Sequence, residues 1–346
     1  MPFTVQLTPI VNRRDGIGRL AFNISRLLSD HGQLNLILTE RQESFLHWGP
    51  VRRGLLREPK SWRDLKVTQP STVIYHHSIG TRVADHFLNL PARKKIVIYH
   101  GVTTPELLAE SQREDAVWGA RQLEMIARSV DHAFAFSDFT GNELRRLGCP
   151  AVTTVPYYFP EVVAGKRVRS KTILVVGRVV KHKRVLECLE AFQKLAQMDG
   201  TVRLLIIGSL RGDPDYAGTL REFVASHFLS RRVKFLGKIS DRHLLRLYYS
   251  SSILLSLSEH EGFCIPIVEA LRAGLAVVAT RDGALKETLG TVGLAVESRD
   301  PDSVAQALRQ ALERPTTGEV AADIASHLLK FEPGRFEIPF LKAVLA

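Results

Sequence analysis

Cysteine is scarce in this sequence, and long apolar runs are missing. The three cysteines, Cys149, Cys188 and Cys264, lie far apart, and none forms a Cys-x-x-Cys pair. Three scattered cysteines exclude a disulfide framework and a cysteine-based zinc site. No stretch approaches the roughly 18 to 20 uncharged residues that a membrane-spanning helix needs, and the first residues lack the charged and apolar regions of a secretory signal. We therefore expect a protein of the reducing cytoplasm.

Low-complexity tracts and internal repeats are also absent, which argues against a largely disordered chain. Hydrophobic residues make up 45% of the sequence and charged residues 24%, the usual composition of a globular protein. At 346 residues the chain is about twice the size of a typical domain. We expect two domains, each large enough to bury its own core.

Acidic residues are outnumbered by basic ones, 36 against 47, and the net charge of +11 is unevenly distributed. Residues 166–238 contain 16 Lys or Arg and 6 Asp or Glu, and residues 13–95 contain 15 and 7. The block at 166–238 includes the candidate phosphate site described below. The block at 13–95 suits anionic lipid at the inner face of a membrane or an acidic acceptor, but an ordinary solvated surface would have the same composition.

Short β-branched runs alternate with amphipathic stretches along most of the chain, which is typical of parallel βαβ units. In the first half the expected strands are residues 4–7, 34–38, 72–75, 96–99, 133–136 and 153–155. In the second half they are residues 172–176, 204–207, 234–235, 253–257, 276–279 and 293–296. Helices are expected at residues 18–30, 113–129, 139–147, 185–197, 217–226, 241–249, 266–273 and 301–313. The pattern predicts the α/β class, with two doubly wound parallel-sheet (Rossmann-like) domains, residues 1–165 and 166–330, joined by a linker at 156–169 and facing each other across a cleft.

The most informative segment, residues 258–270, reads Ser-Glu-His-Glu-Gly-Phe-Cys-Ile-Pro-Ile-Val-Glu-Ala, follows an apolar strand and opens a helix. A glycine turn at a helix N-terminus presents backbone amides that suit a diphosphate. Glu261 and Glu269 flank this turn, and a carboxylate beside a diphosphate would repel it. We therefore expect both glutamates to accept hydrogen bonds from sugar and ribose hydroxyls, although a first-turn Glu that only favours the helix dipole would also explain Glu269.

A second turn of the same kind lies at residues 175–184, Val-Val-Gly-Arg-Val-Val-Lys-His-Lys-Arg. Gly177 ends the strand, Arg178 offers a planar pair of donors and Lys183 a point charge. Together they could neutralise a leaving diphosphate without a metal. The alternative is a solvated basic turn, which the position directly after a strand disfavours.

Weaker signals lie in the first half of the chain. Gly16 and Gly18 form a Gly-x-Gly before the first expected helix, which is either a phosphate loop or a plain tight turn. His100 follows the strand at 96–99, and His76 and His77 also lie at a strand end. Each of these histidines is either structural or a ligand-binding group.

The segment 258–270 resembles the E-x7-E signature of the retaining glycosyltransferases of family 4, the glycosyl transferases group 1, which have the two-domain GT-B fold. The resemblance extends through most of the chain, including the Gly-Arg…Lys turn. It implies that Glu261 lies by the donor sugar, Glu269 holds the ribose, and Arg178 and Lys183 grip the diphosphate. It also implies donor contacts from His100 and from backbone at Gly16, Gly18, Gly177, Gly208, Lys238, Ile239, Gly262, Phe263 and Cys264.

One departure from the family pattern is Cys264, because the family usually has glycine at this position. If the backbone there must be left-handed, the cysteine costs about 1 kcal/mol or more. In relatives the last segment, here residues 331–346, crosses back to the first domain, and we expect the same here.

The resemblance implies a retaining, metal-independent transferase that moves a hexose of the mannose or glucose type from a GDP- or UDP-sugar. The acceptor would be a glycan or a lipid-linked molecule in polysaccharide or lipopolysaccharide assembly. No cofactor and no metal are expected, since Asp213-Pro214-Asp215 only spells the D-x-D of a different transferase fold. A nucleotide-sugar epimerase or phosphorylase stays open as an alternative. A basic nucleic-acid or membrane-binding module is disfavoured because no known nucleic-acid motif is present.

Overall fold

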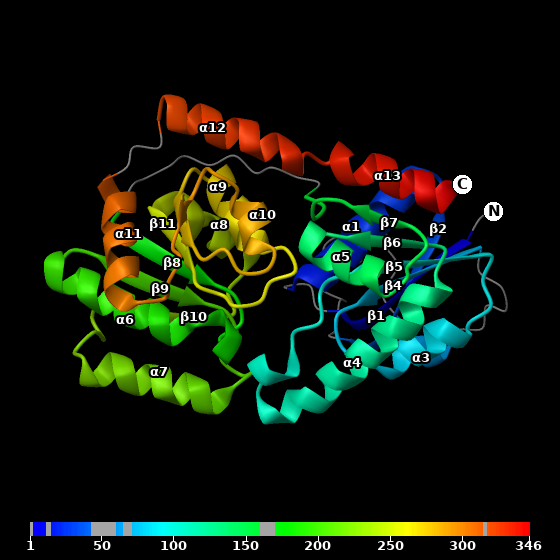
Figure 1. The fold of residues 1–346 in the computed structure, drawn as a ribbon, viewed down its shortest axis with the longest axis horizontal. Helices are drawn as coiled ribbons and strands as arrows, with labels where there is room; N and C mark the ends of the chain where they lie inside the picture. Colours follow the sequence, from blue (N-terminus) through cyan, green and yellow to red (C-terminus); the bar gives the residue numbers. More distant parts are fainter. Residues whose placement is uncertain (1–2, 12–14, 43–59, 65–70, 160–169, 314–316) are drawn as a thin grey trace. The chain divides into compact units, whose positions relative to one another are not determined.

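The computed structural model describes residues 3–11, 15–42, 60–64, 71–159, 170–313 and 317–346 (Figure 1). The chain divides into two compact units. The first comprises Met1–Pro105, Glu110–Pro160 and Glu332–Ala346, and the second Glu106–Ala109 and Glu161–Phe331. The expected domain boundary at 165/166 and most of the expected linker lie within residues 160–169, outside the described residues.

The first unit is built on a seven-stranded sheet in the order β3-β2-β1-β4-β5-β6-β7, with every neighbouring pair parallel. The strands are β1 (Phe3–Val11), β2 (Leu34–Gln42), β3 (Lys60–Ser61), β4 (Thr72–His77), β5 (Lys94–Tyr99), β6 (His132–Ala135) and β7 (Val152–Thr154). All six strands expected in this half are present. The two-residue β3 is too short to leave a hydrophobic pattern in the sequence.

The helices of the first unit are α1 (Gly16–Asp30), α3 (Arg82–Asn89), α4 (Glu110–Ser129), α5 (Asp138–Arg146) and α13 (Gly334–Leu345), with the short 3-10 turn η1 (Trp62–Asp64). A further 3-10 turn, η2 (Pro105–Leu107), begins in this unit and ends in the short segment assigned to the second. Polar side chains cap α1, α3 and α5. Ser137 caps α5 by accepting a hydrogen bond from the Thr140 amide at 3.2 Å. The predicted start of α1 at Gly18 is two residues late, because Asp15 is the cap. The sequence also misses α3, which spans only eight residues.

Helices cover both faces of this sheet (Figure 1). On one face, Tyr75 of β4 stacks on Phe87 of α3 at 5.2 Å between ring centroids. On the other, Phe134 of β6 packs against Phe336 and Phe340 of α13, at 6.4 and 5.5 Å.

The last segment of the chain is held to the first unit by polar contacts as well. The Tyr158 hydroxyl donates to Glu337 at 2.6 Å, and the Lys94 ammonium donates to the Ala343 carbonyl at 2.8 Å. Phe336 and Phe340 are fully buried. The residues that follow Phe331 thus share the core of the first unit, although they come last in the sequence.

The second unit contains a six-stranded parallel sheet in the order β10-β9-β8-β11-β12-β13. The strands are β8 (Thr172–Val176), β9 (Arg203–Ile207), β10 (Val233–Gly237), β11 (Ile253–Ser256), β12 (Ala276–Ala279) and β13 (Leu294–Ala295). Counted within the unit, this order is 3-2-1-4-5-6, that of the dinucleotide-binding fold. Each strand expected from the sequence is present, with ends that differ by a few residues.

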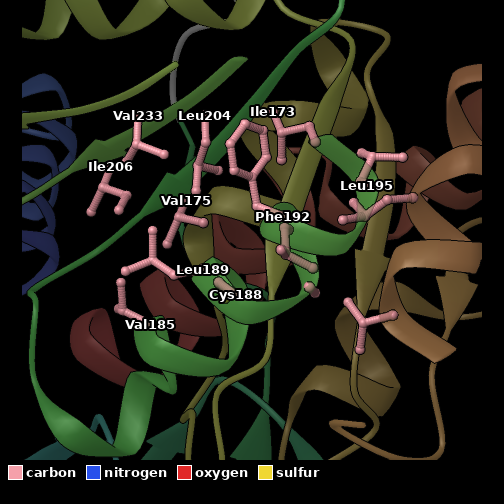
Figure 2. Close-up of a cluster of buried hydrophobic side chains, with 14 of the residues drawn as sticks. Ile173, Val175, Val185, Cys188, Leu189, Phe192, Leu195, Leu204, Ile206 and Val233 are labelled. Carbon is pink, nitrogen blue, oxygen red and sulfur yellow. The ribbon is translucent and has the colours of Figure 1, made fainter. Parts of the chain in front are cut away.

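Two apolar cores flank this sheet, one on each face. The helices and 3-10 turns are η3 (Lys181–Lys183), α6 (Val185–Met198), α7 (Pro214–Ser226), α8 (Asp241–Ser250), α9 (Ile265–Arg272), α10 (Leu285–Leu289), α11 (Pro301–Glu313), α12 (Glu319–Leu328) and η4 (Leu329–Phe331). Figure 2 shows part of the first core, in which Val185, Leu189 and Phe192 of α6 lie beside Val175 and Leu204 of the sheet. Within the described part of the chain, no helix is both long enough and apolar enough to cross a bilayer.

Candidate functional site

The topological switch point of the second sheet lies between β8 and β11. These strands are neighbours, yet the chain leaves β8 toward β9 on one side and leaves β11 toward β12 on the other. In such sheets ligands bind beside the carboxyl ends of the two diverging strands. Here those ends lead into the two turns singled out in the sequence, residues 177–184 after β8 and residues 257–264 after β11.

The turn after β8 is shaped by a close approach of two glycines. Gly177 has a φ of 149° and Gly208 a φ of 148°, values that favour glycine. A Cβ atom on Gly208 would lie 1.6 Å from the Gly177 carbonyl oxygen. The absence of a side chain at Gly208 therefore allows the end of β9 to pack closely against the end of β8. The Gly177 amide donates to the Ile207 carbonyl at 2.9 Å, and this hydrogen bond holds the Gly177 backbone in place.

Lys183 and Glu261 bring the two turns together. The Lys183 ammonium lies 2.5 Å from Glu261 Oε1, and the side chains are 18% and 15% exposed. Burial alone would raise the pKa of Glu261, but the ammonium and hydrogen bonds of Lys183 and a further bond from Ser258 lower it below its usual value. The result is an ionised pair at the strand ends, positioned where an anionic or hydroxyl-bearing ligand could complete its hydrogen bonds.

Arg184 provides a second connection between these turns, which was not predicted from the sequence. Its backbone is left-handed, with φ 52° and ψ 44°, and its guanidinium pairs with Glu187 at 2.8 Å and with Glu259. The Glu259 amide also donates to the His182 carbonyl at 2.9 Å. These bonds join the turn that carries Lys183 to the turn that carries Glu261, and so they help to position the two side chains relative to each other.

Glu269 lies one turn inside α9 and contacts a different helix. The hydroxyl of Tyr248, a residue of α8 that is 2% exposed, donates to Glu269 Oε2 at 3.0 Å. This bond orients the Glu269 carboxylate. Tyr248 lies in a helix with no motif, so only the fold identifies it as the orienting partner.

The turn from Glu261 to Cys264 is anchored through its carbonyl groups. The Glu261 carbonyl accepts from the Ala284 amide at 3.2 Å, and the Phe263 carbonyl accepts from the Thr288 hydroxyl. The Phe263 ring is buried edge-on against Phe331, with centroids 5.7 Å apart. The side chain of Phe263 thus belongs to the core, so this residue can contribute to a site at the turn only through its backbone, as Gly262 does.

Cys264 is the cap of α9 and has left-handed backbone angles, φ 68° and ψ 67°. The condition stated from the sequence is therefore met, since a non-glycine residue occupies a conformation that costs roughly 1–2 kcal/mol in an L-residue. The thiol is buried near the Ser256 hydroxyl at 3.9 Å, and burial raises its pKa. This cysteine is held in place against its own backbone preference.

At Cys264, substitution by glycine should give a more stable protein than substitution by alanine, the reverse of the usual order. Because only glycine is at ease in the left-handed region, Cys264→Gly should be more stable than Cys264→Ala by about 1 kcal/mol. At Cys188, buried within α6, the order should be the normal one, with alanine favoured by about 1 kcal/mol. Urea unfolding of the four variants measures both differences, and a Cys264→Ala protein as stable as Cys264→Gly would contradict the strain.

The candidate residues of the first unit are arranged around α1 and the ends of β4 and β5. Gly16 and Gly18 lie in the first turn of α1, and the Gly18 amide donates to Asp15 Oδ1 at 2.7 Å. The Asp15 side chain therefore caps the helix by accepting from that amide. His100 follows β5, with Nε2 3.2 Å from Nδ1 of His76, while His76 and His77 are fully buried.

The other candidate residues lie on the surface of the second unit or serve local structure. Lys238 is exposed after β10, and Ile239 packs partly against the core beside it. Arg178 is exposed directly after Gly177. Asp213, of the sequence Asp-Pro-Asp, caps α7 by accepting from the Tyr216 amide at 3.0 Å, and no cluster of three or more metal-ligating side chains occurs among the described residues.

The sequence is similar to a known family model and to known proteins. Residues 159–327 match the family model described as glycosyl transferases group 1. O-antigen chain mannosyltransferase B of Escherichia coli is 30% identical over 149 residues, which cover 43% of this chain and 38% of that protein. The GDP-mannose:cellobiosyl-diphosphopolyprenol alpha-mannosyltransferase of Xanthomonas campestris is 34% identical over 229 residues, 64% of this chain and 59% of that protein. The chain therefore covers less than two thirds of the length of either relative.

Solved structures resemble the whole chain. Anabaena HepE in complex with UDP and glucose superposes with a TM-score of 0.78 at 15% identity, covering 99% of both chains. A glycosyltransferase from Rickettsia africae gives a TM-score of 0.72 at 16% identity, covering 99% of this chain and 97% of that one. At such identities the likeness concerns the fold. The chain thus has the two-domain α/β fold of the GT-B glycosyltransferases, and its residues 159–327 are similar to the glycosyl transferases group 1.

Proposed function

We propose that this protein transfers a hexosyl group from a nucleoside diphosphate sugar to a glycan or lipid-linked acceptor, with retention of configuration and without a metal. The observation that carries this proposal is the Lys183–Glu261 pair at the switch point of the second sheet. It combines a cation suited to a diphosphate with a carboxylate suited to a sugar hydroxyl. In the reaction, the bond from the anomeric carbon to the diphosphate breaks and a bond to an acceptor oxygen forms.

Catalysis would rest on stabilising the departing diphosphate. Arg178 and Lys183 follow β8 on one short turn, and two cations facing developing negative charge can replace a metal ion in that task. Backbone from Gly177 and from Gly262 to Cys264 would complete the diphosphate and sugar contacts. Glu269, oriented by Tyr248, would accept the ribose hydroxyls, and the base would lie near Lys238 and Ile239. In the first unit, His100 and the turn at Gly16 and Gly18 would contribute to the donor.

The names of relatives favour mannose as the sugar. Three of the similar proteins are a mannosyltransferase of O-antigen chains, a GDP-mannose-dependent enzyme acting on a diphosphopolyprenol, and a GDP-mannose-dependent enzyme acting on a phosphatidylinositol dimannoside. The structurally similar HepE was solved with UDP-glucose. We therefore propose GDP-mannose as the first donor to test and UDP-glucose as the second.

A lipid-linked acceptor would bring the protein to a membrane surface. Residues 13–95 carry 15 basic against 7 acidic side chains, which suits peripheral contact with anionic lipid at the inner face of a membrane. From the sequence we expect loops around residues 41–66 and 101–115 to select the acceptor, and most of residues 41–66 lie outside the described residues.

A panel of nucleotide sugars tests the proposal directly. Binding and slow donor hydrolysis should occur with at least one GDP- or UDP-hexose and should be unchanged by EDTA. Proton NMR of the glycoside product should show the anomeric configuration of the donor. A requirement for a divalent ion would overturn the metal-free mechanism, an inverted product would overturn retention, and failure of every nucleotide sugar to bind would overturn the class of reaction.

A further inference from the structure

A chain of hydrogen bonds leads from the interior of the first unit to His100. Nε2 of His100 lies 3.2 Å from Nδ1 of His76, and Nε2 of His76 lies 3.0 Å from Oε1 of Gln6. His76 and Gln6 are fully buried, on β4 and β1. Both ring nitrogens of His76 are thus engaged within the protein, so His76 acts on a ligand only through His100.

The orientation of Gln6 is fixed by groups on α1. Its amide nitrogen donates to the Ala21 carbonyl at 3.2 Å and to the Ser25 hydroxyl at 2.9 Å. The Ser25 hydroxyl uses its own proton on the Ala21 carbonyl, at 3.0 Å. A carbonyl oxygen can only accept, so turning the Gln6 amide over would set two acceptors against each other. Gln6 must therefore present Oε1, an acceptor, to His76.

From this orientation the proton positions on both histidines follow. His76 must carry its proton on Nε2 to donate to Gln6, which leaves Nδ1 as an acceptor in the neutral ring. His100 must then carry its proton on Nε2 to donate to His76. Its Nδ1 has a lone pair. Burial lowers the pKa of His76 to about 3, and burial together with the neighbouring His76 and His77 lowers that of His100 well below 6.5, so both rings are neutral at pH 7.

We propose that Gln6 and His76 are positioning residues that hold His100 as its neutral Nε2–H tautomer, so that Nδ1 accepts a hydrogen bond from a hydroxyl of the bound sugar. A neutral acceptor is suited to a hydroxyl and unsuited to a phosphate oxygen, which needs a donor. The assignment of the ligand rests on the proposed function. The tautomer itself depends only on the hydrogen bonds within the first unit.

The adjacent His77 provides a matched control. It is fully buried like His76, but its Nε2 donates to the Gly119 carbonyl of α4 at 2.9 Å, on the opposite face of the sheet. Burial lowers its pKa to about 4. Substitution of His77 removes a buried imidazole with two hydrogen-bonded ring nitrogens, one to the Gly119 carbonyl and one to the Tyr75 hydroxyl at 3.4 Å, as substitution of His76 does. It leaves the Gln6 and His76 side chains in place.

The first measurement is the tautomer of His100 in the free protein. Long-range proton–nitrogen correlation spectra of protein labelled with ¹⁵N in its histidine rings, with His100→Gln to identify the signal, should show Nε2 protonated and Nδ1 bare at pH 7. A proton on Nδ1 of His100 would overturn the inference whether or not a nucleotide sugar binds. If the tautomer is as expected and no nucleotide sugar binds, the proposed function fails and the hydrogen-bond chain stands.

The second measurement links the tautomer to activity. Gln6→Met removes the acceptor for His76, so both histidines become free to change tautomer. We expect mixed His100 tautomers and a decrease of about tenfold in kcat/KM for the donor, the worth of one hydrogen bond. His77→Gln should change neither readout, because it leaves the hydrogen bonds from Gln6 through His76 to His100 in place. A Gln6→Met protein with native activity, or one with lower activity but an unchanged His100 tautomer, would refute the positioning role.

Discussion

Replacing Lys183 by methionine is expected to lower kcat for sugar transfer on the order of 10²- to 10³-fold, the usual cost of removing one group that faces charge developing in a transition state. Methionine keeps most of the aliphatic side chain and removes the ammonium. The effect should fall mainly on kcat, because the negative charge of the diphosphate is greatest as it leaves. Steady-state kinetics with a saturating donor would measure it.

Two further variants separate this effect from damage to the fold. Lys183→Met leaves the Glu261 carboxylate, 15% exposed, without its ammonium, and an unpaired buried charge is strongly destabilising. The double variant Lys183→Met with Glu261→Gln removes that charge, so it should recover thermal stability without recovering activity. Lys181→Met, at an exposed lysine of the same 3-10 turn, should keep kcat within a few-fold of the parent. A catalytic loss of equal size in Lys181→Met would mean that the turn contributes only general positive charge.

Replacing Glu269 by alanine should weaken binding of the donor nucleotide about 10- to 100-fold. A hydrogen bond to a charged group contributes about 1.5–3 kcal/mol, and each 1.4 kcal/mol corresponds to a factor of ten in affinity. Tyr248→Phe removes only the hydroxyl that orients the carboxylate, so we expect a smaller loss in the same direction. Isothermal titration calorimetry with the nucleoside diphosphate measures both.

A control is needed for the alternative that Glu269 only favours the helix dipole. Glu319 is an exposed glutamate in the first turn of α12, where its interaction with the helix contributes about 0.3–1 kcal/mol to stability. Glu319→Ala should lower stability by that amount and leave nucleotide binding unchanged. If Glu269→Ala behaves like Glu319→Ala, with a small stability loss and unchanged affinity, Glu269 does not hold the ribose.

The strand-to-helix turns were predictable because their chemistry is local. Gly177 directly follows an apolar strand, Gly262 follows another after a few residues, and the charged residues of each motif lie within a few positions of these glycines. A turn, a helix cap and a short apolar strand each depend on neighbouring residues, so a linear pattern is sufficient to detect them. The pairing of Lys183 with Glu261 also requires β8 and β11 to be neighbours in the sheet. The alternation of strands and helices led us to expect a site shared by the two turns, but the contact between the two side chains comes from the structure.

Other features of the site had no signature in the sequence. Arg184 and Glu259 are separated by 75 positions, and Tyr248 and Glu269 by 21. Nothing near Arg184 or Tyr248 distinguishes them from the many surface arginines and buried tyrosines of similar chains. The strain at Cys264 could be stated only as a condition, because the backbone angles of a helix cap depend on the strand, turn and core that surround it.

By itself the sequence determined the alternation of strands and helices, the α/β class and the two turns that carry the candidate chemistry, because these depend on periodicity and on residues close together in the chain. The tertiary structure alone decided that Gln6 orients His76, that Arg184 joins Glu259, and that the aromatic face of α13 completes the core of the first unit. Each of these contacts joins residues from distant parts of the sequence. Their energy comes from burial and from hydrogen-bond geometry, neither of which exists until the sheets have formed.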